Sequence, residues 1–204
     1  MDANHIVLLG RQGSGKTTLS RELNGYGFRR VISYTTRPPR SGELDGIDYN
    51  FVDDYDFDHM AERGELVALR EYKTMFGLWK YGLRIGDINR PADTVTIIDP
   101  KGFTEIRDSI EGRFSVFIDI PKDVRMARLL ARGDYSKEIE RREKSDDEQM
   151  FDYLDHNYQD LCDMRVAQIR PPRMEALRVM ETLRAFNRGD IDYDGTVEDK
   201  SIAK

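Results

Sequence analysis

Three short stretches of the chain are rich in apolar and β-branched residues: HIVLLG at 5–10, DTVTIIDPKG at 93–102 and RFSVFIDIP at 113–121. Apolar runs of this length are typical of strands that are buried on both faces of a sheet. Two shorter stretches, RRVIS at 29–33 and DMRVAQI at 163–169, predict further strands. The centre of the predicted sheet is therefore expected to lie in the interior of the domain.

Helical periodicity separates these strands along the chain. Leu19 and Leu23 are four residues apart in a segment that begins at Lys16, and the glycines at 25 and 27 predict its end. A second helix is predicted at 102–112, between two of the buried strands. Strands that alternate with helices favour a parallel sheet with covered faces, so the predicted fold class is α/β with a central parallel sheet.

Two more helices are predicted after the last long strand. The segment 121–133 has a proline at its first position and a glycine after its end, the favoured arrangement at helix termini. The segment 174–186 is amphipathic, with apolar side chains along one side at Leu177, Met180 and Leu183. The α/β pattern therefore continues to about residue 187.

Two regions interrupt this pattern. From 33 to 91 the period is irregular, with aromatic residues between Gly and Pro signals and one short helix predicted at 55–65. The stretch 136–156 is strongly charged, which is typical of a solvated face or of a lid that packs when a ligand binds. We therefore expect one domain at 1–187. Its expected parts are a core at 1–32, 92–121 and 149–187, an insertion at 33–91 and a lid at 122–148, followed by a polar tail at 188–204.

The composition excludes several classes of protein. Of the 204 residues, 39% are hydrophobic and 34% charged, which is typical of a globular domain, and the formal net charge of −6 argues against a general nucleic-acid or anionic-membrane surface. No run approaches the roughly 18 apolar residues of a membrane span, and the chain does not begin with a basic leader segment. Cys162 is the only cysteine, so no disulfide framework is expected. We expect a cytoplasmic protein without nucleic-acid or membrane partners.

The sequence GRQGSGKT, from Gly10 to Thr17, matches the phosphate-binding loop (P-loop) pattern G-x-x-x-x-G-K-[ST] between a predicted strand and a predicted helix. In such a loop, backbone N–H groups cradle phosphate oxygens, the lysine reaches the β- and γ-phosphates, and the hydroxyl ligates Mg²⁺. The flanking strand and helix make an ordinary glycine-rich turn a poor alternative. We therefore expect ATP and Mg²⁺ as cofactors, with Thr17 on the metal. The residues expected to bind ATP are Gly10, Gly13, Ser14, Gly15, Lys16, Thr17 and Thr18.

The stretch SYTTRPPRSGELDGIDYNFV, at 33–52, holds Arg37 and Arg40 three residues apart, each beside a proline. By local composition alone it would be a solvated surface hairpin. A phosphoryl donor needs an acceptor, however, and paired arginines with a tyrosine suit the phosphate of that acceptor. The stretch resembles the guanylate kinase family signature T-R-x-x-R-x-x-E-x-x-G-x-x-Y-x-F, and the resemblance extends from the N-terminus to about Arg142. The matching residues are Thr36, Arg37, Arg40, Glu43, Gly46, Tyr49 and Phe51.

The resemblance to guanylate kinases implies roles for individual residues. The residues implied to hold the 5′-phosphate of the acceptor are Arg37, Arg40, Tyr49 and Tyr81. Ser33 is implied to touch the acceptor base, Asp99 to lie near the base and the metal, and Glu43 is expected to order the arginines. The residues that match lid arginines are Arg128, Arg132 and Arg142, or its neighbour Arg141; a solvated helix face is their alternative. The residues expected to stabilise the transferring phosphoryl group are Lys16, Arg37, Arg128, Arg132 and Arg142.

The residues expected to read the acceptor base depart from the family pattern. Guanylate kinases use a glutamate for the N1–H and N2–H₂ groups of guanine and a hydroxyl for O6. Counting without gaps places Ala68 at the glutamate position, and Glu71, which we retain as the expected base-binding residue, takes it only if two extra residues are allowed. Leu83 stands at the hydroxyl position and cannot donate. Either the acceptor base is not guanine, or another donor substitutes, for which the candidates are Lys80, Arg84 and Thr74.

These features favour Mg²⁺- and ATP-dependent phosphorylation of a nucleoside monophosphate, with GMP or dGMP expected as acceptor and GDP or dGDP as product. The predicted architecture is a P-loop kinase in which the insertion at 33–91 binds the acceptor and the helical lid at 122–148 closes over it. One alternative is a kinase of the same fold that acts on another phosphorylated acceptor. The other is a non-catalytic protein-binding module, although such modules typically have a degraded phosphate loop. The expected partners are small-molecule nucleotides, and the sequence is compatible with a monomer or a homo-oligomer.

Overall fold

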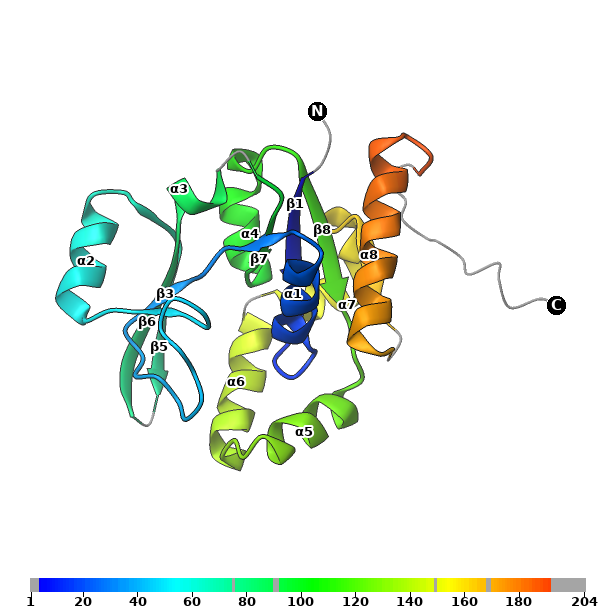
Figure 1. Ribbon diagram of the computed structural model, residues 1–204. Helices are drawn as coiled ribbons and strands as arrows, with labels where there is room; N and C mark the ends of the chain where they lie inside the picture. The colour runs from blue at the N-terminus through cyan, green and yellow to red at the C-terminus, as the bar shows by residue number, and fades with distance from the viewer. Residues whose placement is uncertain (1–3, 75, 90–91, 149, 168–169, 192–204) are drawn as a thin grey trace.

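The larger sheet of the protein has five parallel strands in the order β2-β7-β1-β8-β9. The computed structural model describes residues 4–191 except 75, 90–91, 149 and 168–169 (Figure 1). The predicted parallel sheet is confirmed, although β2 keeps only two residues of the stretch RRVIS. The strands are β1 (His5–Leu9), β2 (Arg29–Arg30), β7 (Thr94–Ile97), β8 (Arg113–Ile118) and β9 (Met164–Val166).

Helices cover both faces of this sheet (Figure 1). One face carries α1 (Lys16–Gly25) and α8 (Pro172–Asn187), which contact each other, and the other carries α4 (Pro100–Ile106) and α7 (Phe151–Asn157). Each face of the sheet has its own hydrophobic core. From Ile6 to Leu9, successive side chains of β1 belong alternately to these two cores, and all five residues of the strand are buried. After His5 the strand is apolar, because neither of its faces meets solvent.

The buried face of α8 differs from the predicted one. Ala176, Val179 and Leu183 lie in the core, whereas Leu177 and Met180 are half-buried. The predicted apolar line is therefore displaced, because the contact with α1 and the sheet runs through 176, 179 and 183.

The charged region after β8 forms separate helices. The first, α5 (Lys122–Ala131), begins after Pro121, which takes the cap position and not the first helical position that the sequence predicted. The next, α6 (Ser136–Glu148), is separated from α7 by Met150, whose φ of 70° breaks the helix. The predicted charged helical stretch is thus two helices, and its second half supplies Phe151 and Leu154 to the core.

The insertion contains a second sheet with the strand order β4-β3-β6-β5. Figure 1 shows this sheet to one side of the larger one, with α2 (Asp54–Glu62) at its outer end. The sequence predicted α2 but not the sheet, because two of its strands are only two residues long and charged residues interrupt the apolar residues of the other two. The strands are β3 (Tyr34–Thr35), β4 (Asn50–Phe51), β5 (Leu66–Thr74) and β6 (Gly77–Arg84).

A bulge interrupts the pairing of β5 with β6. Val67 pairs with Leu83 but Arg70 pairs with Tyr81, so the register shifts between them, and Ala68 has a φ of 51°. Because side chains alternate along a strand, a shift of one residue exchanges the side chains that face its two sides. The bulge therefore decides which residues of β5 face the larger sheet.

Short helices complete the described part of the chain: α3 (Ile85–Ile88) and 3₁₀ turns at Arg107–Ser109 and Tyr158–Asp160. Within the described ranges, none of the helices is both long enough and apolar enough to cross a membrane.

Candidate active site

A cavity of about 750 Å³ opens at the carboxyl ends of β1 and β7, between the larger sheet, the second sheet and the helices α5 and α6. Ligands of open parallel sheets bind at this edge. All of the residues that the sequence predicted for the site line this cavity, except Ser14 and Glu71. The fold thus brings together segments that are more than a hundred residues apart in the chain.

The loop after β1 allows close approach of the backbone to a ligand. Gly13 and Gly15 have φ values of 73° and 103°, which favour glycine. A Cβ atom at Gly13 would stand 2.7 Å from the carbonyl oxygen of Arg125, so a larger residue does not fit. Gly15 caps α1, whose first N–H groups have no acceptor within the helix. The cavity therefore meets the positive end of α1, where phosphate oxygens bind well.

Lys16 is held within the same loop. Its Nζ donates to the carbonyl oxygens of Gly10 at 2.5 Å and Arg11 at 2.9 Å. Burial lowers the pKa of Lys16 to about 8, while the nearby carboxylate of Asp146 acts in the opposite direction. A neighbouring anion favours the charged form of such a group, so bound phosphate would raise its pKa again.

The arginines of the 33–52 stretch, which are expected to hold the acceptor phosphate, form an ordered cluster with Glu43, Tyr49 and Tyr81 that we call the clamp. The Arg37 side chain is 2% exposed, and its Nη2 lies 2.9 Å from the carboxylate of Glu43. The rings of Tyr49 and Phe51 lie beside the guanidinium, whose central carbon is 5.2 and 5.6 Å from their centroids. Glu43 also accepts the backbone N–H of Arg40 at 2.7 Å. These contacts confirm the prediction that Glu43 orders both arginines.

Tyrosines and positive charge complete the clamp. Tyr49 and Tyr81 meet edge to face at 6.0 Å between ring centroids. Tyr49 directly precedes β4, Tyr81 lies on β6, and both of these strands pair with β3. Burial lowers the pKa of Arg40, and the adjacent cations Arg142 and Arg37 lower it further. This local excess of positive charge suits a phosphate group.

The helices α5 and α6, which make up the expected lid, contact the P-loop directly. Arg128 of α5 donates through Nη1 to the carbonyl oxygens of Gly13 and Ser14, both at 3.2 Å. One turn earlier, Arg125 pairs with Glu143 of α6 at 2.6 Å, which ties the two lid helices to each other. The lid therefore lies against the loop that is expected to hold the donor phosphates.

Three more lid arginines line the cavity. Arg132 pairs with Asp134, and Arg142 donates to Glu138 at 2.9 Å. Arg141 bonds to the same Glu138 and also lines the cavity, so the structure brings both neighbours to the site. The two carboxylates hold the arginines in place before any substrate is present, which reduces the entropy lost on binding.

The residues that could hold a metal ion are few. Thr17 is exposed at the start of α1, and Asp99 caps α4 by accepting the N–H of Gly102 at 2.7 Å. In the part of the chain that the structure describes, no three or more His, Cys, Asp or Glu side chains form a metal-binding group. Mg²⁺ usually keeps several waters and takes one or two protein ligands together with substrate phosphates. The residues present therefore fit a Mg²⁺ ion that arrives with its nucleotide.

Comparison with known proteins agrees with this geometry. A family model described as guanylate kinase matches residues 2–163. A guanylate kinase from Neisseria meningitidis serogroup A / serotype 4A is 36% identical over 149 residues, which cover 70% of this chain and 71% of that protein. One from Legionella pneumophila (strain Paris) is 35% identical over 164 residues, which cover 74% and 77%. The chain belongs to the guanylate kinase family.

A solved structure shows the same fold for another guanylate kinase. The crystal structure of the enzyme from Anaplasma phagocytophilum superimposes with a TM-score of 0.62 at 22% sequence identity, over 91% of this chain and 87% of that one. The P-loop kinase fold predicted from the sequence is therefore confirmed.

In this guanylate kinase, the part of the cavity that is expected to hold the acceptor base presents an arginine where a glutamate was predicted. Arg70 and Tyr72 line it beside Ala68 and Leu83, whereas Glu71 is exposed and pairs across the strands with Lys80. The position of Glu71 does not support the predicted contact with the acceptor, because the bulge turns its side chain away from the cavity.

The three alternative donors also lie elsewhere, since none of them lines the cavity. Lys80 bonds to Asp58 at 2.6 Å, and Arg84 pairs with Glu65 at 3.1 Å. Thr74 donates to the carbonyl oxygen of Gly77 within the β5–β6 turn. None of the three is therefore placed to supply the missing guanine contact.

Sequence analysis missed Arg70, which the structure places next to Asp99. Its Nε donates to Asp99 at 3.3 Å and its Nη1 to Glu105 at 3.0 Å, so two carboxylates orient the guanidinium. The sequence shows that Arg70 and Tyr72 point to one face of the strand and Glu71 to the other. It does not show which of these faces meets the cavity, because that depends on the bulge.

Proposed function

We propose that this member of the guanylate kinase family transfers the γ-phosphoryl group of Mg²⁺·ATP to GMP or dGMP, which yields ADP and GDP or dGDP. The observation that carries the proposal is the single cavity that holds both a P-loop and an ordered arginine clamp. Relatives named guanylate kinase align over 71% and 77% of their own length, which supports the same reaction.

The donor triphosphate binds at the P-loop in this proposal. The N–H groups at the start of α1 and the Lys16 ammonium receive the phosphate oxygens. Thr17 and Asp99 would hold Mg²⁺, which supplies positive charge to the phosphate oxygens. Asp99 is already anchored by the N–H of Gly102, so its carboxylate is held toward the cavity at little further cost in entropy.

The acceptor binds in the insertion at 33–91. Arg37, Arg40, Tyr49 and Tyr81 hold its 5′-phosphate, and Ser33 lies on the same wall toward the base. Because Glu43 already bonds to Arg37 and to the backbone of Arg40, the clamp is set before the acceptor arrives. This positioning directs an acceptor phosphate oxygen toward the donor.

The chemistry consists mainly of positioning and charge neutralisation. Charge that spreads over the oxygens of the transferring group is met by Lys16 and Arg37 and by the lid arginines Arg128, Arg132 and Arg142. Closing of the lid at 122–148 excludes water, so that the acceptor and not water receives the phosphoryl group. Because the arginines of the lid already line the cavity, only a small movement of the lid is required for them to reach the transferring group.

Arg70 supports guanine as the acceptor base. Guanine presents two adjacent acceptors, O6 and N7, which an arginine fork can bind at once, whereas adenine presents N7 beside an amino donor. The carboxylate of Asp99 next to Arg70 can accept an N–H of the same base. We place the reaction in the cytoplasm, with small-molecule nucleotides as the partners.

The deciding experiment measures ADP release from Mg²⁺·ATP with GMP, dGMP, AMP, CMP, UMP or dTMP as acceptor. Turnover with GMP or dGMP that exceeds the other four by at least roughly 100-fold would support the proposal, since a site built for hydrogen bonds rejects bases that lack them. Preference for another base would keep the kinase and reject guanine. Tight ATP binding without turnover of any of the six would reject nucleoside monophosphate kinase activity. A Lys16→Ala variant serves as the inactive control.

A further inference from the structure

Two large aromatic side chains are mostly exposed at neighbouring tips of the structure. Phe76 lies in the turn between β5 and β6 of the insertion and is 58% exposed, whereas Tyr135 lies between α5 and α6 of the expected lid and is 72% exposed. Their ring centroids are 6.5 Å apart, although the two residues are distant in the chain. Exposed apolar side chains that gather in one place often mark an interaction site. This pair is a contact between the insertion and the lid.

On the insertion side, Phe76 is held by Trp79. The two rings are stacked, with 6.1 Å between their centroids and 8° between their planes. Trp79 pairs directly with Tyr72 across β5 and β6, and both residues line the larger cavity. Side chains of directly paired residues lie on the same face of a sheet. The contact of Phe76 with the lid is therefore continuous, through Trp79, with the wall of the cavity that also carries Arg70.

On the lid side, Tyr135 is connected to the arginines that line the cavity. It follows Arg132 by three positions, and its carbonyl oxygen accepts the N–H of Glu138 at 2.9 Å in the first turn of α6. The same helix carries Arg141 and Arg142, which line the cavity together with Arg132. A contact that fixes Tyr135 therefore also fixes the backbone that carries these arginines.

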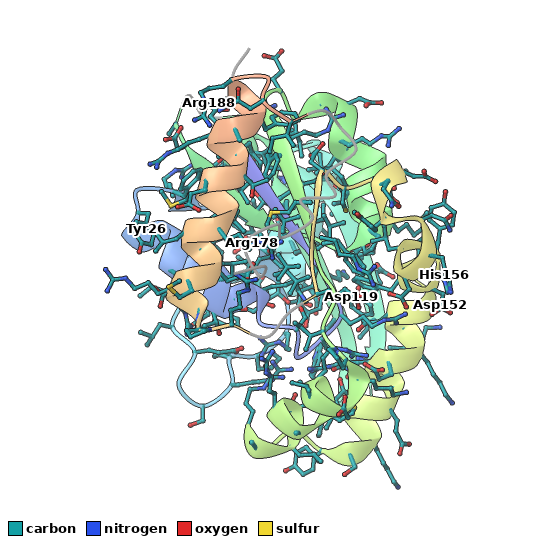
Figure 2. The ribbon with its side chains drawn as sticks, turned by 90° about the vertical axis from the view of Figure 1, so that its right-hand side faces the viewer. Tyr26, Asp119, Asp152, His156, Arg178 and Arg188 are labelled. Atoms are coloured by element: carbon teal, nitrogen blue, oxygen red, sulfur yellow. The ribbon has the colours of Figure 1, made fainter. Side chains whose placement is uncertain are left out.

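The other end of the lid is anchored to the P-loop. Asp146, near the end of α6, accepts the backbone N–H of Gln12 at 3.0 Å, and Asp152 of α7, labelled in Figure 2, pairs with Arg11 at 2.8 Å. The 13 residues of α6 make this helix roughly 20 Å long, with Tyr135 just before its first residue. A rotation about the anchored end therefore moves the tip of the lid most, and the ring contact opposes that movement.

A second contact between the lid and the hairpin of β5 and β6 lies inside the cavity. The guanidinium of Arg141 lies over the ring of Tyr72, with its central carbon 5.9 Å from the ring centroid. A cation is attracted to the face of an aromatic ring. The lid thus meets the hairpin both at its tip and along α6.

We propose that Phe76 and Tyr135 form a latch that holds the lid against the hairpin and so positions the lid arginines for phosphoryl transfer. The proposal rests on the function proposed above. The two rings act through the arginines and do not touch a substrate, so they are positioning residues. A weaker latch should slow transfer to the acceptor and admit water, which then takes the γ-phosphoryl group of ATP and yields ADP and inorganic phosphate.

The alternative is that the two rings meet only incidentally at the surface. Phe76 would then serve to cover Trp79, and Tyr135 would only begin α6. Under this alternative, loss of Tyr135 would lower stability at most and would leave the division of phosphoryl groups between acceptor and water unchanged. That division therefore separates the two explanations.

The first experiment measures kcat, the KM for ATP and the ratio of inorganic phosphate to GDP formed from Mg²⁺·ATP and GMP. Phe76→Ala and Tyr135→Ala should each lower kcat and raise this ratio by roughly 3- to 10-fold, the effect of one aromatic pair, without changing the KM for ATP. The double variant should be no worse than either single one, because the first substitution already removes the contact. Tyr135→Phe keeps the ring and should behave like the native protein.

The matched control is Tyr55→Ala. Tyr55 is 75% exposed and stacks on His59 within α2, so its loss removes a comparable exposed ring outside the latch. We expect kcat and the ratio of phosphate to GDP to equal those of the native protein. Because Phe76, Tyr135 and Tyr55 are all mostly exposed, none of these substitutions should prevent folding.

The second experiment follows the lid without turnover, by energy transfer from Trp79 to a fluorescent label on Lys137→Cys of α6. Trp79 is the only tryptophan of the chain, Lys137 is exposed, and the only native cysteine, Cys162, is buried. In the ligand-free protein, each single latch variant should raise the fraction of open lid roughly 3- to 10-fold, which lowers the transfer efficiency below that of the native background.

Both experiments can contradict the latch. An unchanged kcat with an unchanged ratio in Tyr135→Ala, additive effects in the double variant, or equal transfer efficiency in native and variant proteins would overturn it. A native protein that phosphorylates none of the nucleoside monophosphates tested above would reject the proposed reaction. The energy transfer would then still decide whether the two rings hold the lid.

Discussion

Arg37 and Glu43 form an ion pair at 2.9 Å, in which the Arg37 side chain is 2% exposed and lies beside the rings of Tyr49 and Phe51. The same carboxylate accepts the backbone N–H of Arg40. One side chain therefore sets the geometry of both arginines that are expected to hold the acceptor phosphate. Removing it would leave the Arg37 guanidinium buried without its counter-ion, a costly change in a protein interior.

Glu43→Ala should consequently weaken acceptor binding selectively. We expect the KM for GMP to rise roughly 10- to 100-fold, the effect of losing hydrogen bonds to charged groups, while the KM for ATP stays unchanged. Steady-state kinetics with each substrate varied in turn provide the measurement. The control is Asp58→Ala, which breaks the ion pair with Lys80 outside the cavity. It should leave the KM for GMP and the KM for ATP unchanged. An unchanged KM for GMP in Glu43→Ala would refute the clamp as described.

The position of Arg70 predicts which edge of the acceptor base is read. 7-Deaza-GMP, which lacks N7, should lose roughly 10-fold or more in kcat/KM, whereas IMP, which keeps O6 and N7 but lacks the amino group, should remain close to GMP. In Arg70→Ala the difference between GMP and 7-deaza-GMP should disappear, although overall activity falls. Glu71→Ala should behave like the native enzyme, because Glu71 is exposed outside the cavity. Poor turnover of IMP together with damage from Glu71→Ala would show that the amino edge is read by Glu71 instead.

Gly13→Ala should abolish ATP binding. The added Cβ would stand 2.7 Å from the carbonyl oxygen of Arg125, so the loop or α5 must move, and the left-handed φ adds strain of about 1–3 kcal/mol. Gly27→Ala is the matched control, since Gly27 also has a left-handed φ but no atom within 4 Å of the added Cβ. Thermal unfolding should show that both variants are destabilised, while calorimetry with ATP shows a loss of binding only for Gly13→Ala. Normal ATP affinity in Gly13→Ala would contradict the tight contact between loop and lid.

ATP affinity should fall as the pH rises through about 8. Burial lowers the pKa of Lys16 from 10.5 to about 8, so in the free protein its ammonium is charged below that pH and neutral above it. Bound phosphate favours the charged form and raises the pKa, so the dissociation constant for ATP should increase across this range and level off near the pKa of the complex. Lys16→Met should bind ATP weakly and without this pH dependence. The same pH dependence in Lys16→Met would assign the titration to another group.

Local motifs account for the part of the site that could be predicted from sequence. The P-loop from Gly10 to Thr17 and the clamp from Arg37 to Tyr49 are each an unbroken stretch of sequence. Their glycines, prolines and arginines determine backbone shape and charge within a few residues. The buried strands are equally local, because a run such as HIVLLG tolerates no exposed face. Fold class and family follow from these segments alone, together with the P-loop and clamp residues that line the cavity.

Tertiary structure decided the features that depend on pairing between distant segments. The bulge at Ala68 turns Arg70 into the cavity and Glu71 out of it, and its register is set by the bonds of β5 with β6, which the residues of β5 do not encode by themselves. The contact of Phe76 with Tyr135 is similar: on separate turns the two would be unrelated exposed rings. They meet because the fold brings the turn between β5 and β6 to the junction of α5 and α6, and only that arrangement joins the insertion to the tip of the lid.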